Sequence, residues 1–481
     1  MMESFLLPDV GGLIDGRWRR QSSGGSFDVV DPATGDVLAV LPRMGEAEAT
    51  EAVEAAARAL RTDVPLEQRR AWLTAIHDRL ADFKQEFARI ITLEHGKPLK
   101  ESVAEVEYTA GFFRFFAAHV GRLESESLPG PIRNCRWTIH HRPAGVAGLI
   151  TPWNFPLAMI GKKVAPAIAA GCSVVIKPAQ QAPLSTIAMA HLAATVGIPA
   201  GRLNVVVGAA GAIGSVLCRH PAVRVISFTG STEVGRILIE QTAPHIKRLA
   251  LELGGNAPFI VFDDADPETA VSALLANKFR AGGQTCVCTN RVYVQRGIAA
   301  SFTEAVADRV RALKVGNGLA PDTDIGPLID RAAFDKVAAH VRDAMARGAR
   351  RLVGGDPPRP ANDWGAFYPP TVLTGVTPAM LVCREETFGP VVAIAEFEDE
   401  AGVIDAANDT CFGLAAYVFT RDADRAARVV RRLQFGHVGV NTGTGPTPEA
   451  PFGGMKQSGF GREGGVEGLM EFCETQVVAE A

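Results

Sequence analysis

The sequence predicts an α/β protein of more than one domain, and three observations lead to this prediction. Its 481 residues exceed what one hydrophobic core usually organises, so two or three domains are expected. From Gly145 onward, short β-rich runs alternate with alanine-rich helical stretches, which is typical of parallel strands covered by helices. Glycine-containing turns follow several of these runs, at the strand ends where such sheets bind ligands.

The N-terminal part precedes the alternating pattern and has helical composition. Helices are expected over residues 46–61, around Leu66–Glu94 and over Leu99–Val120. Residues 122–143 change character, because a Pro-Gly-Pro turn is followed by partial alternation of polar and apolar residues. That alternation indicates a strand that leaves the helical region.

The alternating region supplies the first predicted sheet. Its β-rich runs are Val146–Ile150, Ser173–Ile176, Asn204–Val207 and Val223–Phe228, and helical stretches such as Leu184–Thr195 lie between them. Three motifs begin where runs end: Thr151–Pro156, Lys177–Gln180 and Thr229–Gly235. Because the carboxyl ends of parallel strands share one edge, these motifs together predict a dinucleotide site.

The rest of the chain predicts a second α/β portion and a tail. The second portion opens near Asp263 and runs to roughly Gly445. The final segment, Glu463 to Ala481, has the pattern of a helix followed by a strand.

Composition excludes several classes of function. The net charge is −4 with no basic block, so neither nucleic acid nor an anionic membrane is an expected partner. The eight cysteines form no disulfide framework, and no metal-ligand spacing involves the histidines, so no metal is expected. The most apolar window, Gly145 to Gly161, is interrupted by Pro152, Asn154 and Pro156, and the N-terminus lacks a signal-peptide series. A reducing, cytoplasmic setting is expected.

Three side chains on glycine- or proline-rich stretches are candidates for chemistry. Cys286 follows a Gly-Gly pair that lets the backbone approach closely, and a thiolate is a strong nucleophile. The alternative, a buried structural thiol, is commoner for an isolated cysteine. Glu252 lies between two leucines, where burial would raise its pKa towards that of a general base. Asn154 sits in a rigid Trp and Pro frame and can donate to an oxyanion.

These stretches, in this order and spacing, resemble the aldehyde dehydrogenase superfamily over essentially the whole chain. The likeness runs from Ile14-Asp15-Gly16-Arg17-Trp18 through Glu386-Thr387-Phe388-Gly389-Pro390 to Pro451-Phe452-Gly453-Gly454 and Gly461-Arg462-Glu463. It implies a Rossmann-like dinucleotide-binding domain (1–121 and 144–253) and an α/β catalytic domain (254–445). It also implies a small β oligomerisation segment with a C-terminal tail (122–143 and 446–481), and hence a homodimer or homotetramer.

The resemblance also implies a mechanism. Cys286 attacks an aldehyde, Asn154 stabilises the oxyanion, a hydride passes to NAD(P)+ to leave a thioester, and Glu252 activates the hydrolytic water. Lys163 matches a lysine that the family has near its active site, although a surface lysine is the plainer interpretation. A non-catalytic protein on this scaffold is the alternative from another class, and the intact Cys286, Glu252 and Asn154 argue against it.

Cofactor contacts follow from matching motifs. The matching positions are Thr151, Pro152, Trp153, Lys177, Gln180, Gly208, Thr229, Gly230, Ser231, Glu386 and Phe388. NAD-specific members usually have a glutamate where this chain has Gln180, so use of both NAD and NADP is expected. In the loop that contains Gly208, Ala210 replaces a frequent glycine.

The match points to an ω-carboxylated aldehyde as the small-molecule substrate. Phe155, Lys162, Arg280 and Phe452 match positions on the substrate tunnel. The two cations favour a succinate-semialdehyde dehydrogenase, although Lys162 stands where such enzymes commonly have arginine. Another ω-carboxylated aldehyde, such as glutarate semialdehyde, or an aromatic or aliphatic aldehyde is the alternative. Simple core packing is the alternative for the two phenylalanines, and pairing with a glutamate is the alternative for Lys162.

Cys288 lies one residue beyond the expected nucleophile. Some related semialdehyde dehydrogenases have the same Cys-Val-Cys sequence, and there the pair can close as a disulfide that stops activity. Such a bridge would be strained and easily reduced. A plain second thiol packed behind the site is the alternative.

Overall fold

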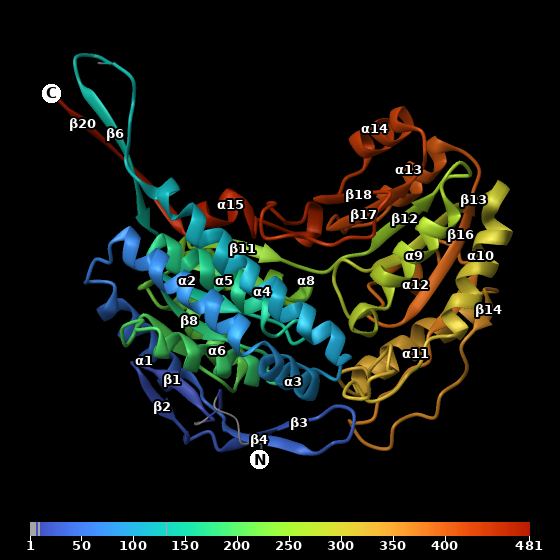
Figure 1. Ribbon diagram of the computed structural model, residues 1–481, viewed down its shortest axis with the longest axis horizontal. Helices are drawn as coiled ribbons and strands as arrows, with labels where there is room; N and C mark the ends of the chain where they lie inside the picture. Colours follow the sequence, from blue (N-terminus) through green and yellow to red (C-terminus); the bar gives the residue numbers. More distant parts are fainter. Residues whose placement is uncertain (1–5, 8–9, 131) are drawn as a thin grey trace.

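Two large β-sheets, each covered by helices, form the two lobes of the computed structural model, which describes residues 6–7, 10–130 and 132–481 (Figure 1). The first sheet has the order β19-β11-β10-β7-β8-β9-β1-β2, and its central strands β9, β8, β7, β10 and β11 run parallel. Its strands are β1 (Gly12–Ile14), β2 (Arg17–Arg19), β7 (Val146–Ile150), β8 (Ser173–Lys177), β9 (Leu203–Val205), β10 (Val223–Thr229), β11 (Arg248–Glu252) and β19 (Gly459–Phe460).

The second sheet has the order β14-β15-β16-β13-β12-β17-β18, and only β14 is antiparallel to its neighbour. Its strands are β12 (Ala257–Val261), β13 (Thr289–Gln295), β14 (Arg350–Val353), β15 (Thr371–Thr374), β16 (Val391–Phe397), β17 (Ala415–Phe419) and β18 (His437–Val440). The buried central strands are continuous apolar runs, as expected for strands covered on both faces. The α/β class predicted from the sequence is therefore confirmed.

Helices cover both sheets. In the first lobe they are α1 (Glu46–Ala59), α2 (Leu66–Asp82), α3 (Lys84–His95), α4 (Leu99–His119), η1 (Val120–Leu123), α5 (Ala158–Ala170), α6 (Leu184–Thr195), α7 (Ala210–Arg219), α8 (Thr232–Thr242) and η2 (Ala243–His245). In the second lobe and tail they are α9 (Pro267–Lys278), η3 (Arg280–Gly283), α10 (Arg296–Arg311), α11 (Arg331–Ala346), α12 (Leu381–Arg384), α13 (Glu400–Asn408), α14 (Ala423–Arg432), η4 (Lys456–Ser458) and α15 (Gly465–Met470). The helix expected around Leu66–Glu94 is divided at Phe83, whose ψ of 22° leaves the helical region.

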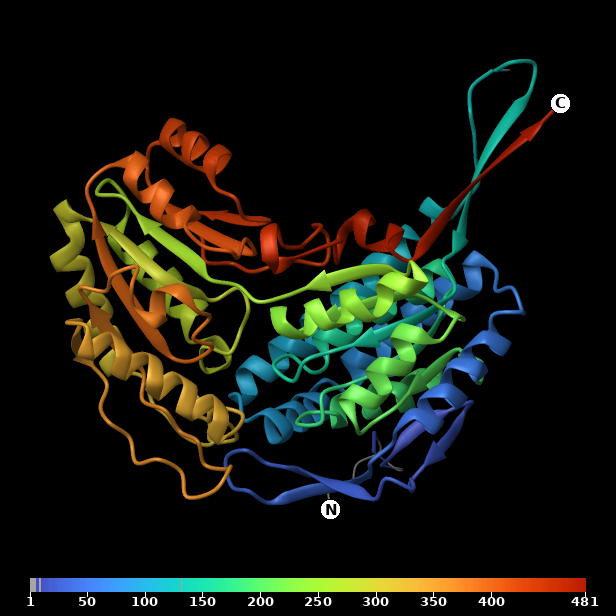
Figure 2. The same ribbon diagram turned by 180° about the vertical axis from the view of Figure 1, so that it is seen from behind.

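An arm projects from the first lobe and carries the C-terminus (Figures 1 and 2). It is a three-stranded antiparallel sheet of β5 (Glu126–Ser127), β6 (Arg136–Pro143) and β20 (Cys473–Glu480), in which β6 pairs with β20 of the same chain. A separate hairpin, β3 (Ser26–Val30) and β4 (Val37–Pro42), lies near the N-terminus. The tail also reaches the main body, because β19 pairs with β11 at the edge of the first sheet.

Helix α5 brings two lysines into the core of the first lobe. All thirteen of its residues are buried, including Lys162 and Lys163. Lysine is almost never fully buried without a partner, so both ammonium groups are expected to pair with acidic or polar side chains. Among the residues described, we find no helix whose length and hydropathy would let it span a bilayer.

Candidate active site

The loop that leads to Cys286 has three consecutive residues in the left-handed region of backbone conformation, which favours glycine. Ala281, Gly282 and Gly283 in η3 have φ of 50°, 65° and 78°. A Cβ added to Gly283 would lie 2.2 Å from the carbonyl oxygen of Gly389, so the glycine lets two loops of the second lobe touch. The cysteine loop is thereby held against the segment that carries Glu386 and Phe388.

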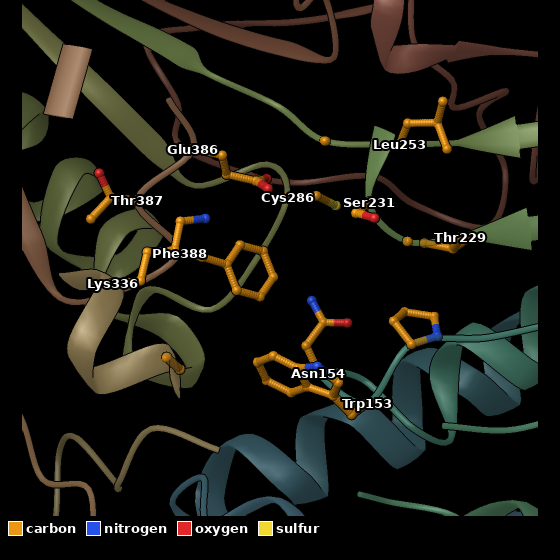
Figure 3. A pocket seen from close by; sticks show the side chains of 14 residues that line it. Trp153, Asn154, Thr229, Ser231, Leu253, Cys286, Lys336, Glu386, Thr387 and Phe388 are labelled. Carbon is orange, nitrogen blue, oxygen red and sulfur yellow. The ribbon is translucent and has the colours of Figure 1, made fainter. Parts of the chain in front are cut away.

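Two cavities meet at Cys286, which lines both of them. The larger, of about 270 Å³, opens at the carboxyl ends of the parallel strands in the first sheet (Figure 3). The smaller, of about 130 Å³, lies against α4 and α5. A nucleophile on the boundary can therefore contact one molecule on each side.

The larger cavity gathers most of the predicted cofactor residues. These are Pro152, Trp153, Thr229, Gly230, Ser231, Glu386 and Phe388. Asn154 and five residues that the sequence did not single out as site residues, Leu253, Gly254, Ala333, Lys336 and Thr387, also line it. Lys336 is an exposed cation on α11. An exposed lysine on a helix looks the same in the sequence whether or not it lines a cavity, so the sequence did not identify it.

The other four predicted cofactor residues lie outside that cavity. Thr151 is buried and its N–H donates to the carbonyl of Lys177. The Lys177 ammonium donates to the Pro178 carbonyl at 2.8 Å, and burial lowers its pKa to about 8. Gln180 lines a separate cavity near β3, and Gly208 is buried where a Cβ would lie 2.4 Å from the Met44 nitrogen. Their cofactor roles stay predictions.

The larger cavity fits a dinucleotide. Helix α8 begins at its wall, where Ser231 accepts a hydrogen bond from the Val234 N–H as N-cap, and helix N-termini attract phosphate. The Thr229 hydroxyl is buried with no partner among the described residues. Glu386 accepts from the Gly255 N–H at 3.1 Å, and burial raises its pKa to about 7. Phe388 and Trp153 meet edge to face at 5.6 Å and form an aromatic wall.

The smaller cavity gathers all four predicted substrate residues, Phe155, Lys162, Arg280 and Phe452. The Lys162 ammonium lies 5.1 Å from the centre of the Phe452 ring, and the Arg280 guanidinium lies 4.9 Å from that of Phe155. Tyr108, which the sequence analysis did not select, also lines it, and its hydroxyl is buried without a partner among the described residues.

The side chain of Asn154 bridges to the cysteine loop. Its Nδ2 donates to the carbonyl of Gln284 at 2.9 Å, two residues before Cys286. Its Oδ1 makes no hydrogen bond within the described chain. Because an amide nitrogen carries two N–H groups, the second N–H remains available to donate to a ligand.

Glu252 ends β11 as part of a buried cluster of four charged residues. Neither of its carboxylate oxygens has a hydrogen-bond partner in the described residues. Burial, reinforced by Glu463, raises its pKa well above the ordinary value, against the opposing influence of Lys162 and Lys163. Glu252 is thus a carboxyl group whose burial favours the protonated form, which suits a group that must take up a proton.

Glu463 is the member of this cluster that the sequence analysis did not predict as a site residue. Its carboxylate forms an ion pair with Lys162, whose Nζ lies 2.6 Å from Oε2, and accepts a hydrogen bond from Lys163, which also donates to Ser227 at 3.0 Å. Burial opposes its ionisation, but the two lysines outweigh burial and lower its pKa to about 2. The Gly-Arg-Glu sequence gave no sign of this, because the partners are 300 residues away.

The two thiols of the cysteine loop differ in surroundings. Burial raises the pKa of Cys286 to about 12, Glu386 adds to this, and Lys162 opposes it. These surroundings favour the thiol over the thiolate, because burial outweighs the nearby lysine. Cys288 is buried behind it, donates to the Gly283 carbonyl at 3.3 Å and lies 3.6 Å from the Lys278 ammonium.

The fold, with a cysteine between two cavities, defines the class of nicotinamide-dependent oxidoreductases. In the described residues, no group of three or more His, Cys, Asp or Glu side chains is arranged to hold a metal ion.

The particular family follows from comparison with known proteins. Residues 18–478 match the aldehyde dehydrogenase family, and the chain belongs to that family. It is 47% identical to the NADP(+) succinate-semialdehyde dehydrogenase GabD of Escherichia coli (strain K12), over 96% of each chain. It is 48% identical to the 3-sulfolactaldehyde dehydrogenase of Pseudomonas putida, over 97% of this chain and 96% of the relative. An oxidoreductase crystal structure from Marinobacter aquaeolei superposes with a TM-score of 0.97 at 54% identity, covering 100% of both chains. The family resemblance in the sequence is confirmed, and the cofactor is NAD or NADP.

Proposed function

We propose that this enzyme oxidises an ω-carboxylated semialdehyde, with succinate semialdehyde as the first candidate, to the dicarboxylate. One observation carries the proposal: Lys162 and Arg280 line the same small cavity as Cys286. Arg280 has no ion-pair partner among the residues described. A cation beside a narrow apolar cavity favours an anionic group on the ligand. The succinate-semialdehyde activity of the Escherichia coli relative supports the same choice.

The chemistry assigned to the site has two stages. Cys286 loses its thiol proton to solvent and adds as the thiolate to the aldehyde carbon, and the resulting oxyanion takes a hydrogen bond from the free N–H of Asn154. NAD(P)+, when bound, supplies the hydride acceptor at its nicotinamide ring. Loss of hydride from the tetrahedral carbon leaves a thioester on Cys286. Glu252 then removes a proton from water, the hydroxide adds to the thioester, and the thiol and carboxylate separate.

The buried cluster suits the second stage. Glu252 must take up a proton from water, and burial raises its pKa, so it is a stronger base than an exposed carboxylate. Lys162, Lys163 and Glu463 carry a net charge of one positive unit, which stabilises the Glu252 carboxylate without pairing with it directly.

The cofactor proposal is use of both NAD and NADP. Gln180 is a neutral amide, so it does not repel a 2′-phosphate as a carboxylate would. The Escherichia coli relative is described as NADP-dependent, while a betaine aldehyde dehydrogenase structure from Staphylococcus aureus contains NAD. We further propose a reducing, cytoplasmic setting, which the eight free cysteines support.

We also propose a homo-oligomer. The arm of β5, β6 and β20 extends away from the first lobe (Figure 2), and Val477 in β20 is 53% exposed. Helix α8 exposes Val234, Ile237 and Ile239, an apolar face that a second copy would cover. Light scattering should give a dimer or tetramer, and a monomer at micromolar concentration would contradict this proposal.

The decisive experiment measures kcat/KM for a panel of aldehydes. Succinate semialdehyde, glutarate semialdehyde, 3-sulfolactaldehyde and butanal would be compared with NAD and NADP. The proposal requires a terminal carboxylate to raise kcat/KM above that of butanal. Highest activity on 3-sulfolactaldehyde would favour a sulfonate substrate. This aldehyde is included because a 48% identical relative is a 3-sulfolactaldehyde dehydrogenase. A preference for butanal would exclude the anionic class altogether.

A further inference from the structure

Helix α4 holds both loops that form the reaction centre. Glu101 and Glu105 lie four residues apart, so both side chains are on the same face of the helix. The Glu101 Oε2 accepts from the Ala281 N–H at 2.6 Å, on the loop that leads to Cys286. Glu105 reaches the other loop, after Asn154.

Glu105 belongs to a fully buried ion pair with Lys97. The two side chains are 0% exposed, and Nζ lies 2.7 Å from Oε2. The other carboxylate oxygen of Glu105 accepts from the N–H groups of Leu157 and Ala158, at 3.0 and 3.1 Å, where α5 begins. A carboxylate at a helix N-terminus is favourable by itself.

Lys97 extends this network to the backbone of Asn154. Its ammonium donates to the Asn154 carbonyl at 2.7 Å and lies 3.8 Å from the centre of the Phe155 ring. The Asn154 side chain is tied in turn to Gln284. The asparagine is thus fixed by its carbonyl on one side and by its amide on the other.

Stability alone does not account for such a pair. Desolvation of two charges offsets most of their attraction, and apolar residues often replace a buried pair without loss of stability. Capping of α5 explains Glu105 but leaves the contact between Lys97 and the Asn154 carbonyl unexplained. Rigid placement of the loop explains both, because small displacements of a catalytic group are costly to rate.

We propose that Lys97 and Glu105 are positioning residues that hold the Asn154 amide at the Cys286 loop, and that they set kcat without contacting the cofactor. This inference rests on the proposed oxyanion role of Asn154. It predicts that replacing Lys97 or Glu105 lowers kcat because the Asn154 amide is displaced, and that the KM for NAD(P)+ does not change.

The test uses the full-length enzyme and whichever aldehyde the wild type oxidises best, so it does not depend on the substrate assignment. Lys97→Met should lower kcat by about a hundredfold, counted per folded site from a dinucleotide-binding titration. Glu105→Gln keeps the acceptor and the shape, and should lose about tenfold. The matched control is Glu107→Gln on the same helix, an exposed carboxylate bonded to Lys84, which should leave kcat unchanged.

A double variant separates positioning from general damage. If Lys97 acts through Asn154, Lys97→Met combined with Asn154→Ala should be no slower than Asn154→Ala alone. Multiplied losses, or a lower Tm with normal kcat per folded site, would overturn the inference. If Lys97→Met does not fold, the test rests on Glu105→Gln, and a normal kcat in that variant would overturn the inference. Full activity of Asn154→Ala would instead remove the oxyanion role, and the inference with it.

Discussion

Replacing Arg280 should reduce selectivity for a carboxylated aldehyde far more than replacing Lys162. The Lys162 ammonium already has a partner, the Glu463 carboxylate at 2.6 Å, whereas Arg280 is exposed at the cavity and has no ion pair in the described residues. A hydrogen bond to a charged group contributes about 1.5–3 kcal/mol. Arg280→Met should therefore lower kcat/KM for succinate semialdehyde about 10–150-fold more than for butanal.

Lys162→Met should show a different defect. Breaking a buried ion pair costs about 3–5 kcal/mol, and the low end applies because Lys163 still pairs with Glu463. The loss should appear as reduced stability to denaturant, with a smaller change in the ratio of the two kcat/KM values.

The assay follows NAD(P)H absorbance with succinate semialdehyde and with butanal. The stability of each variant is measured separately by urea unfolding. The control is Arg309→Met, an exposed arginine paired with Glu268 on the surface. An unchanged ratio in Arg280→Met would refute the assignment of the carboxylate to Arg280. A larger change of ratio in Lys162→Met would refute the argument that Glu463 already matches its charge.

Four further outcomes test other parts of the site. Glu252→Gln should release one burst of NAD(P)H and then stop at the thioester, and steady turnover without a burst would remove its role as base. Because burial raises the pKa of Cys286 to about 12, its alkylation by iodoacetamide without cofactor should rise about tenfold per pH unit, as the thiolate fraction does, between about pH 8 and 10; a plateau below that range would contradict the buried setting. Gln180→Glu should shift initial-rate selectivity towards NAD by about tenfold, and an unchanged ratio would take Gln180 out of the cofactor site. Peroxide should inactivate the wild type reversibly and Cys288→Ala irreversibly, and a peptide map without a Cys286–Cys288 link would exclude the switch.

Much of the fold could be predicted from local sequence. The strand at Val146–Ile150 and the helix at Leu184–Thr195 were placed correctly because buried elements are continuous apolar runs bounded by turn residues. The break at Phe83 could not be foreseen, since neither glycine nor proline marks it. The pairing of β19 with β11 depends on contacts about two hundred residues apart, which no local pattern records.

The candidate site divides in the same way. Asn154, Glu252 and Cys286 stand out because each lies on a stretch with unusual residue types. Glu463 and Lys97 do not stand out, because their importance comes from burial and from partners distant in the chain. The raised pKa of Cys286 is likewise a property of the packed loop rather than of the sequence around it.

The junction of two cavities at Cys286 has a consequence for chemical probes. An electrophile shaped for the smaller cavity, between Phe155 and Phe452, would reach the sulfur without entering the larger one, where we propose that the nucleotide binds. Such a reagent need not compete with the high concentrations of NAD and NADP in a cell. The selectivity of the reagent among related enzymes would then depend on the residues that line the smaller cavity, where an anionic group on the reagent could pair with Arg280.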